Sequence, residues 1–112
     1  MFILGGIVMI RHLVFFSMKP QALEQDGLTN AHTMAEHFRR ISKEIPGVCS
    51  VELGLNYNNE ERFYEMALNQ VFESKQALED YTNDPRHIVV RDFVRQVIDH
   101  RIVIDYDMDC PA

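Results

Sequence analysis

The feature that most constrains the fold is the order in which the spacing of apolar residues changes along the chain. Residues 8–18 (VMIRHLVFFSM) have the β-branched and aromatic content of a strand. Residues 22–44 place apolar side chains every three or four positions, which predicts a helix. Residues 48–56 alternate apolar and polar side chains and predict a second strand. A third strand follows at residues 63–72, after a polar connection that suggests a hairpin.

The second half of the chain predicts a broken helix and a last strand. Ser74 is suited to cap a helix at about 75–82. Pro85 prevents simple continuation, so a separate helix is expected from about 85 to 98. Residues 101–106 (RIVIDY) form the last strand. The order β-α-β-β-α-β predicts an α+β, ferredoxin-like fold, in which helices cover one face of a four-stranded antiparallel sheet.

The start of the first helix is less well defined than its end. The apolar spacing allows a start near Ala22, or an interruption and a new start at Thr29. Gly27 lies between these two positions and weakens a continuous helix. Pro46 and Gly47 end the helix in either case.

The first strand carries large apolar side chains on both of its faces, so both faces are expected to be covered. One face consists of Ile10, His12, Val14, Phe16 and Met18. The opposite face includes Leu13 and Phe15. If the helices cover the first face, the second face is bare in a monomer. We therefore expect two copies of the chain to pair through their sheets.

Length and sequence pattern predict a single domain. The 112 residues match the size of one domain. We expect residues 1–8 to form an N-terminal extension, residues 9–107 the domain and residues 108–112 a tail. The apolar run at residues 1–10 is too short to span a bilayer and lacks the features of a signal peptide.

Charge and cysteine content exclude several classes of partner and site. Eleven Lys and Arg against seventeen Asp and Glu give a net charge of −6, which argues against nucleic acid and anionic membranes as partners. Cys49 and Cys110 are far apart in sequence and belong to no metal-binding array. The five histidines show no metal-ligand spacing, and no nucleotide-binding motif is present. We expect a cytoplasmic protein without a metal or a cofactor.

His12 is the first candidate functional residue, because it is the only polar side chain on an otherwise apolar strand face. One interpretation is a core histidine satisfied by a single hydrogen bond, which is usual for buried polar groups. The other interpretation is a polar anchor inside an apolar ligand pocket. Its position alone leaves both interpretations open.

Tyr81 and His87 are the second candidate site. Tyr81 lies on the apolar side of one predicted helix, and His87 lies in the first turn of the next. A helix N-terminus disfavours the imidazolium ion, so a neutral His87 could act as a base near neutral pH. The alternative is a proline-initiated helix with an exposed histidine in its first turn.

Four stretches of the chain together resemble the stress-responsive A/B barrel domain (Dabb) family. These stretches are MIRHLVFF at 9–16, IPGV at 45–48, FES at 72–74 with Ala77, Leu78 and Tyr81, and DPRH at 84–87 with DHRIVIDY at 99–106. The similarity spans the chain from Met9 to about Tyr106. The order and spacing of the stretches carry it, since no single motif is specific.

The resemblance implies a homodimer that forms a dimeric α+β barrel, with a cavity between sheet and helices in each subunit. In a plant cyclase of this family, a tyrosine and a histidine catalyse a cofactor-free aldol cyclisation. Their positions match Tyr81 and His87, and a pocket histidine matches His12. We expect His12, Phe16 and Phe38 to contact a ligand in such a cavity. This chain departs from the usual His-Pro-x-His turn by having aspartate first and arginine third.

Three functions remain open at the level of sequence. The first is a homodimer that binds a small molecule between sheet and helices. The second is a cofactor-independent enzyme of cyclase or lyase type that acts on a small carbonyl or aromatic compound. In that enzyme His87 would be the base, and Tyr81 would orient the substrate or stabilise an enolate. The third is a purely structural oligomer, in which Phe16 and Phe38 fill the space.

Overall fold

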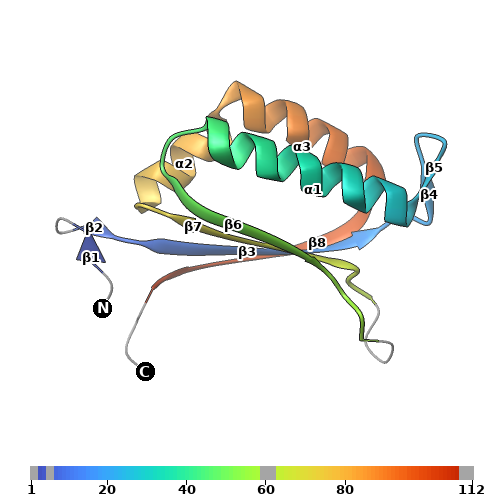
Figure 1. Cartoon of the computed structure of the whole chain (residues 1–112), viewed down its shortest axis with the longest axis horizontal. Helices are drawn as coiled ribbons and strands as arrows, with labels where there is room; N and C mark the ends of the chain where they lie inside the picture. Colours follow the sequence, from blue (N-terminus) through green and yellow to red (C-terminus); the bar gives the residue numbers. More distant parts are fainter. Residues whose placement is uncertain (1–2, 5–6, 59–62, 109–112) are drawn as a thin grey trace.

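A four-stranded antiparallel sheet organises the chain (Figure 1). The computed structural model describes residues 3–4, 7–58 and 63–108. The sheet contains strands β3 (Ile10–Met18), β6 (Val48–Leu55), β7 (Met66–Phe72) and β8 (Ile98–Asp107) in the order β6-β7-β3-β8. Neighbouring strands are antiparallel throughout. The predicted ferredoxin-like α+β fold is therefore confirmed.

Three helices lie together on one face of this sheet, as Figure 1 shows. They are α1 (Gly27–Glu44), α2 (Lys75–Asn83) and α3 (Pro85–Val97). The last helix ends at Val97, and β8 begins three residues earlier than predicted. Ile98 pairs with Met18, where a register shift lengthens the ladder between β3 and β8.

The region before α1 corrects both predicted helix starts. Two short strands, β4 (Gln21–Ala22) and β5 (Gln25–Asp26), form a hairpin there. Leu23 and Glu24 turn the chain with positive φ angles of 51° and 61°. Turns of this kind are usually made by Asn or Gly, so this sequence gives little signal for one. Asp26 then caps the helix, because its side chain accepts a hydrogen bond from the Thr29 amide at 2.7 Å.

Two further short strands lie near the start of the chain. They are β1 (Ile3–Leu4) and β2 (Ile7–Val8), and they pair with each other in antiparallel fashion. The first long strand therefore begins at Ile10, two residues later than predicted. The described residues contain no helix long and apolar enough to cross a membrane.

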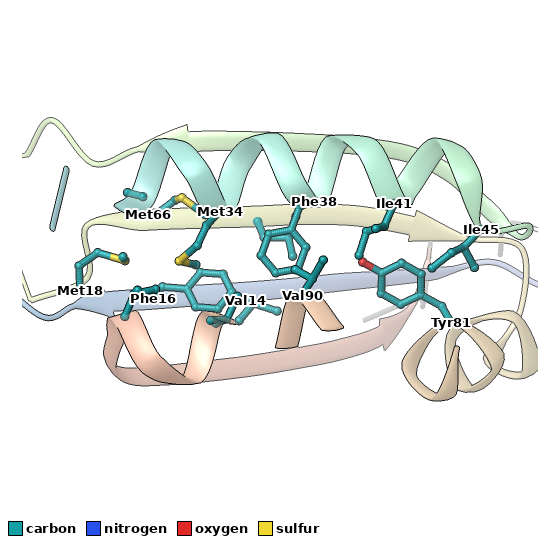
Figure 2. Packing of buried hydrophobic residues seen from close by; sticks show 14 of the residues in the cluster. Val14, Phe16, Met18, Met34, Phe38, Ile41, Ile45, Met66, Tyr81 and Val90 are labelled. Atoms are coloured by element: carbon teal, nitrogen blue, oxygen red, sulfur yellow. The ribbon is translucent and has the colours of Figure 1, made fainter. Parts of the chain in front are cut away.

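The core lies between the helices and the sheet. Figure 2 shows Phe38 of α1 and Tyr81 of α2 in this layer, together with Val14 and Phe16 of β3. Met34 and the other apolar residues at helical spacing in α1 are buried, as the sequence predicted. Burial of this stripe is what holds α1 on the sheet.

Asp84 and Pro85 form the corner between α2 and α3. Asp84 ends α2 and also caps α3, since its side chain accepts a hydrogen bond from the Arg86 amide at 2.9 Å. The Arg86 guanidinium binds the same carboxylate, and hydrogen bonds from Arg86 hold the pKa of Asp84 at about 2. Arg86 also donates to the Glu44 carbonyl oxygen at the end of α1. The corner is thereby attached to α1.

The opposite face of the sheet has no helix over it, and we call it the open face. Its central side chains come from β3 and β8 and are largely apolar: Leu13, Phe15, Ile102, Ile104 and Tyr106. Ile104 lies on the edge strand beside Leu13 and is 45% exposed. The apolar second face predicted from the sequence is therefore present in the folded chain.

Candidate functional site

A small cavity lies between the helix-covered face of the sheet and helices α1, α2 and α3. Its volume is about 30 Å³, which has room for about two water-sized groups. It brings together all five residues singled out in the sequence: His12, Phe16, Phe38, Tyr81 and His87. The other lining residues are Val14, Leu68, Gln70, Arg91, Val94 and Arg101.

A row of polar residues crosses the sheet beneath this cavity. His12 on β3 is paired in register with Gln70 on β7 and with Asp105 on β8. The Nδ1 atom of His12 lies 2.5 Å from Oδ1 of Asp105, and the ring contacts Phe72 edge-on. His12 is hydrogen bonded, as the first interpretation requires, and it also lines the cavity, so a role in binding a ligand stays a prediction. Asp105 fixes the orientation of the ring.

Tyr81 is held in the buried layer by an amide. Its side chain is 1% exposed, and its hydroxyl oxygen accepts a hydrogen bond from Nε2 of Gln70 at 3.1 Å. The same Nε2 donates to Oγ of Ser42 at 2.9 Å. Burial raises the pKa of Tyr81 to about 12, against smaller opposing effects of hydrogen bonding of Tyr81 with Gln70 and Ser42. Tyr81 is therefore a neutral phenol at pH 7 and can donate its hydroxyl proton.

His87 is positioned by the corner between α2 and α3. Its Nδ1 donates to the Thr82 carbonyl oxygen at 3.0 Å, which assigns the ring proton to Nδ1 in the neutral form. Its Nε2 has no hydrogen-bond partner among the described residues and carries a lone pair. The rings of Tyr81 and His87 have centroids 4.7 Å apart.

The electrostatic environment keeps His87 neutral. Burial is the main cause that lowers its pKa, and the charges of Arg91 and Arg101 lower it further. The hydrogen bond to the Thr82 carbonyl acts in the opposite direction and is the weaker effect. Its position at a helix N-terminus was the reason for predicting that His87 is neutral. The direction agrees, but the leading cause in the structure is burial.

Sequence reasoning missed three polar residues of the cavity. Gln70 had a signal of the same kind as His12, because it interrupts the alternating apolar residues Met66, Leu68 and Phe72. Arg91 and Arg101 gave no such signal, since charged residues are ordinary on a helix and on an edge strand. The register and the packing of α3 bring them to the cavity.

The cavity offers a specific set of chemical groups. They are an unprotonated imidazole nitrogen on His87, a phenol proton on Tyr81 and cationic guanidinium groups. This set suits proton transfer to and from a small oxygen-bearing molecule. The described residues contain no cluster of His, Cys, Asp or Glu that could hold a metal ion.

Larger hollows lie elsewhere on the described part of the chain, and the two largest of those found contain none of the predicted site residues. One, of about 440 Å³, lies near Met18, Leu28 and Glu65 at the start of α1. The other, of about 400 Å³, lies on the open face near Phe15 and Tyr64. Size alone would favour them, but the convergent polar groups of the 30 Å³ cavity make it the better candidate site.

Comparison with known proteins supports the fold. The family model for the stress responsive A/B barrel domain matches residues 10–108. A Dabb family protein with a ferredoxin-like fold from Mesorhizobium loti is 25% identical, with a TM-score of 0.71 over 88% of this chain and 95% of its own. A dimeric protein of unknown function with a ferredoxin-like fold from Bacteroides fragilis is 22% identical, with a TM-score of 0.79 over 89% and 96%.

A structurally similar enzyme is also found. The hydroxynitrile lyase from Passiflora edulis is 13% identical to this chain, with a TM-score of 0.79 over 91% of this chain and 94% of its own. At this identity the similarity concerns the fold alone. No curated protein matches the chain in sequence.

Proposed function

Because this chain belongs to the stress responsive A/B barrel domain family, we propose that it is a homodimer whose subunits each bind a small molecule between sheet and helices. Dimerisation would occur through the open face and form a dimeric α+β barrel. The chain as a whole would act in the cytoplasm, in keeping with its two widely separated cysteines.

The apolar open face supports the dimer. Leu13 and Phe15 lie at the centre of the sheet, and Ile104 beside them remains 45% exposed in a single chain. A contiguous apolar surface of this kind is unusual on a monomer, and stacking two copies would remove it from water. The similar protein from Bacteroides fragilis is described as dimeric, which agrees with this proposal.

The observation that carries the ligand site is the pair of unpartnered polar atoms at the cavity. Oε1 of Gln70 is buried and has no hydrogen-bond partner among the described residues. Nε2 of His87 also lacks one. Leaving the buried Oε1 of Gln70 unpaired costs about 1–3 kcal/mol. Both atoms are acceptors, so a bound molecule with two hydrogen-bond donors would satisfy both.

Acid–base catalysis is the second candidate function, and the fixed tautomer of His87 favours it. With its proton held at Nδ1 by the Thr82 carbonyl, His87 would accept a substrate proton at Nε2. Tyr81 would donate a hydrogen bond to the oxygen on which negative charge develops. Return of the proton from His87 to the product would complete the cycle without a cofactor. The similar fold of a hydroxynitrile lyase is compatible with such chemistry.

The test is an NMR screen of small neutral carbonyl compounds, with the imidazole signals of the histidines as the readout. We expect ligands that shift the signals of His12 and His87 together and leave that of the exposed His32 unchanged. The variant His87→Gln should abolish these shifts at His12, whereas the matched control His32→Gln should not. Thermal unfolding of both variants would establish that they are folded.

Turnover distinguishes the binding protein from the enzyme. For the enzyme, His87→Gln should reduce the rate of any reaction found by about 100-fold or more, the usual effect of losing a general base. Binding without turnover supports the first function only. If no compound shifts either histidine and His87→Gln lowers stability, the purely structural oligomer is the better description.

A further inference from the structure

The open face of the sheet is hollowed at one corner, where β6 ends. The hollow has a volume of about 400 Å³, and Phe15, Ala67 and Gly54 lie side by side in it on β3, β7 and β6. A Cβ added at Gly54 would meet no atom within 4 Å, and the φ angle of Gly54 is not positive. Neither packing nor backbone conformation in the described chain therefore requires glycine here. Its effect is to leave space on the open face.

An exposed tyrosine lies at the diagonally opposite corner of the same face. Tyr106 is paired in register with Arg11 near the start of β3, and it is 44% exposed. It belongs to β8, which is one edge of the sheet, whereas Gly54 belongs to β6, which is the other edge. Figure 1 shows the ends of β6 and β8 bending away from the helices. Both corners therefore turn toward the side on which a partner would lie.

Regular strand spacing relates these two corners to the centre of the sheet. Residues lie about 3.3 Å apart along a strand, and strands lie about 4.8 Å apart. Along the ladders, the point midway between Tyr106 and Gly54 falls between β3 and β7, level with Leu13. A two-fold axis through this point, along the diagonal that joins the other two corners, places Tyr106 of one copy over Gly54 of the other. The strands of the two copies then cross at roughly 90°, one of the two usual arrangements of stacked sheets.

Opposite charges on the open face fit the same rotation. Arg11 lies beside Tyr106, and Glu52 lies two residues before Gly54 on β6. Neither charged residue forms an ion pair with the described residues, although the Arg11 guanidinium donates to Oδ1 of Asn69 at 2.8 Å. The rotation brings Arg11 of each copy beside Glu52 of the other. Two copies in this orientation therefore gain two attractive charge pairs on contact.

From this self-complementarity we infer that the partner of the open face is a second copy of the chain with its strands crossed over those of the first. Tyr106 of each subunit fills the hollow at the partner's Gly54, and Arg11 of each subunit binds the partner's Glu52. A buried aromatic side chain in a matching hollow contributes strongly to affinity, and the charge pairs fix the orientation. This inference rests on the proposed homodimer and names the residues that select its partner.

Exchanging the sizes of two side chains tests the hollow. Gly54→Leu should leave a single chain folded, because a Cβ at this position meets no atom within 4 Å. Gly54→Leu and Tyr106→Ala should each raise the dimer dissociation constant about 30-fold or more, measured by analytical ultracentrifugation. The double variant should bind at least about tenfold more tightly than Gly54→Leu alone, because the leucine then occupies the space left by the tyrosine. Val89→Ala is the control for truncation, since Val89 is 69% exposed on α3 and lies away from the open face.

Exchanging two charges tests the orientation. Arg11→Glu and Glu52→Arg should each weaken the dimer about tenfold or more, because each places like charges side by side. The double variant should regain most of the affinity, and added salt should reduce all three differences. Glu36→Arg is the matched control, because Glu36 is exposed on α1 and its replacement changes the net charge by the same amount. It should change the dissociation constant less than about twofold.

The outcomes distinguish this inference from the homodimer on which it rests. If the wild-type chain dimerises and Gly54→Leu leaves the dissociation constant unchanged, the homodimer stands and the crossed pairing is wrong. Double variants that bind no more tightly than their single variants would also overturn the pairing. If the wild-type chain is monomeric, the proposed homodimer fails, and this inference fails with it.

Discussion

The two faces of the sheet are built from alternate residues of the same strands, yet each carries side chains that are unfavourable in a single chain. The covered face contains polar residues, and the open face contains apolar ones. The helix-covered face is apolar but carries the polar row of His12, Gln70 and Asp105. The open face is free of helices but carries the apolar pair Leu13 and Phe15. Polar groups in a core and apolar groups on a surface both cost free energy in an isolated chain. The polar row therefore indicates a ligand site on the covered face, and the apolar pair indicates a partner on the open face.

The most direct test of the difference between the two faces is to truncate a phenylalanine on each of them. Phe16→Ala should lower the free energy of unfolding by about 3–5 kcal/mol, because Phe16 is buried in the core. Phe15→Ala should act mainly on the dimer, so its effect should depend on protein concentration. Urea unfolding at two concentrations measures both. Equal, concentration-independent losses would show that the faces do not differ.

A charge on the open face should weaken the dimer itself. Ile104→Asp would place an unpaired carboxylate in the interface and should raise the dimer dissociation constant about 100-fold or more. Val103→Asp is the matched control, because Val103 is similarly exposed, at 42%, and lies next in sequence but on the helix-covered side. Analytical ultracentrifugation distinguishes them. A dimer unaffected by Ile104→Asp would assign the interface elsewhere.

Removing the amide from the polar row should separate stability from binding. Gln70→Leu keeps a similar volume but removes the amide that donates to Tyr81 and Ser42, so the free energy of unfolding should fall by about 1–3 kcal/mol. Ligand-induced shifts at His87 should be lost. The conservative variant Gln70→Glu is not equivalent, because it buries a charge. A loss of stability beyond that range would indicate that the row is structural.

The smallest effect expected is a pH dependence of stability from His87. Its pKa is lowered in the folded chain from the ordinary value of 6.5, chiefly by burial. The unfolded chain therefore binds a proton at a higher pH than the folded chain. The resulting loss of stability should develop as the pH falls through 6.5 toward the folded-state pKa. Urea unfolding between pH 7.5 and 5.5 should show a shallower slope in His87→Gln than in the wild type or in the exposed control His32→Gln.

The strand and helix order was predictable from sequence because burial imposes a period on each element. The alternation in residues 10–18 and the helical spacing in α1 both follow from covering one face. The hairpin at residues 21–26 was not predictable, since Leu23 and Glu24 adopt positive φ angles without the usual turn residues. Local geometry there is imposed by packing: a Cβ on Gly27 would approach the Lys19 carbonyl oxygen to 2.8 Å.

Prediction of the site was similarly divided. His12 stood out as a polar residue in an apolar period, and Gln70 could have been found by the same rule. Tyr81 and His87 were predicted from their positions on either side of Pro85 and from the resemblance to the Dabb family, and both line the cavity in the structure. Arg91 and Arg101 depend on the register of β8 and on the placement of α3, neither of which is encoded in a short motif.

The corner at Asp84 and Pro85 has a consequence for how such a protein diversifies. Tyr81 and His87 lie on either side of this corner, and Arg86 fastens it to the end of α1. The corner therefore sets the spacing of Tyr81 and His87, and the residues of α3 and β8 that line the cavity do not. If the proposed site binds a ligand, substitutions along α3 and β8 would alter the cavity wall while the spacing of Tyr81 and His87 stays the same. Ligand preference and this pair would then change at separate positions.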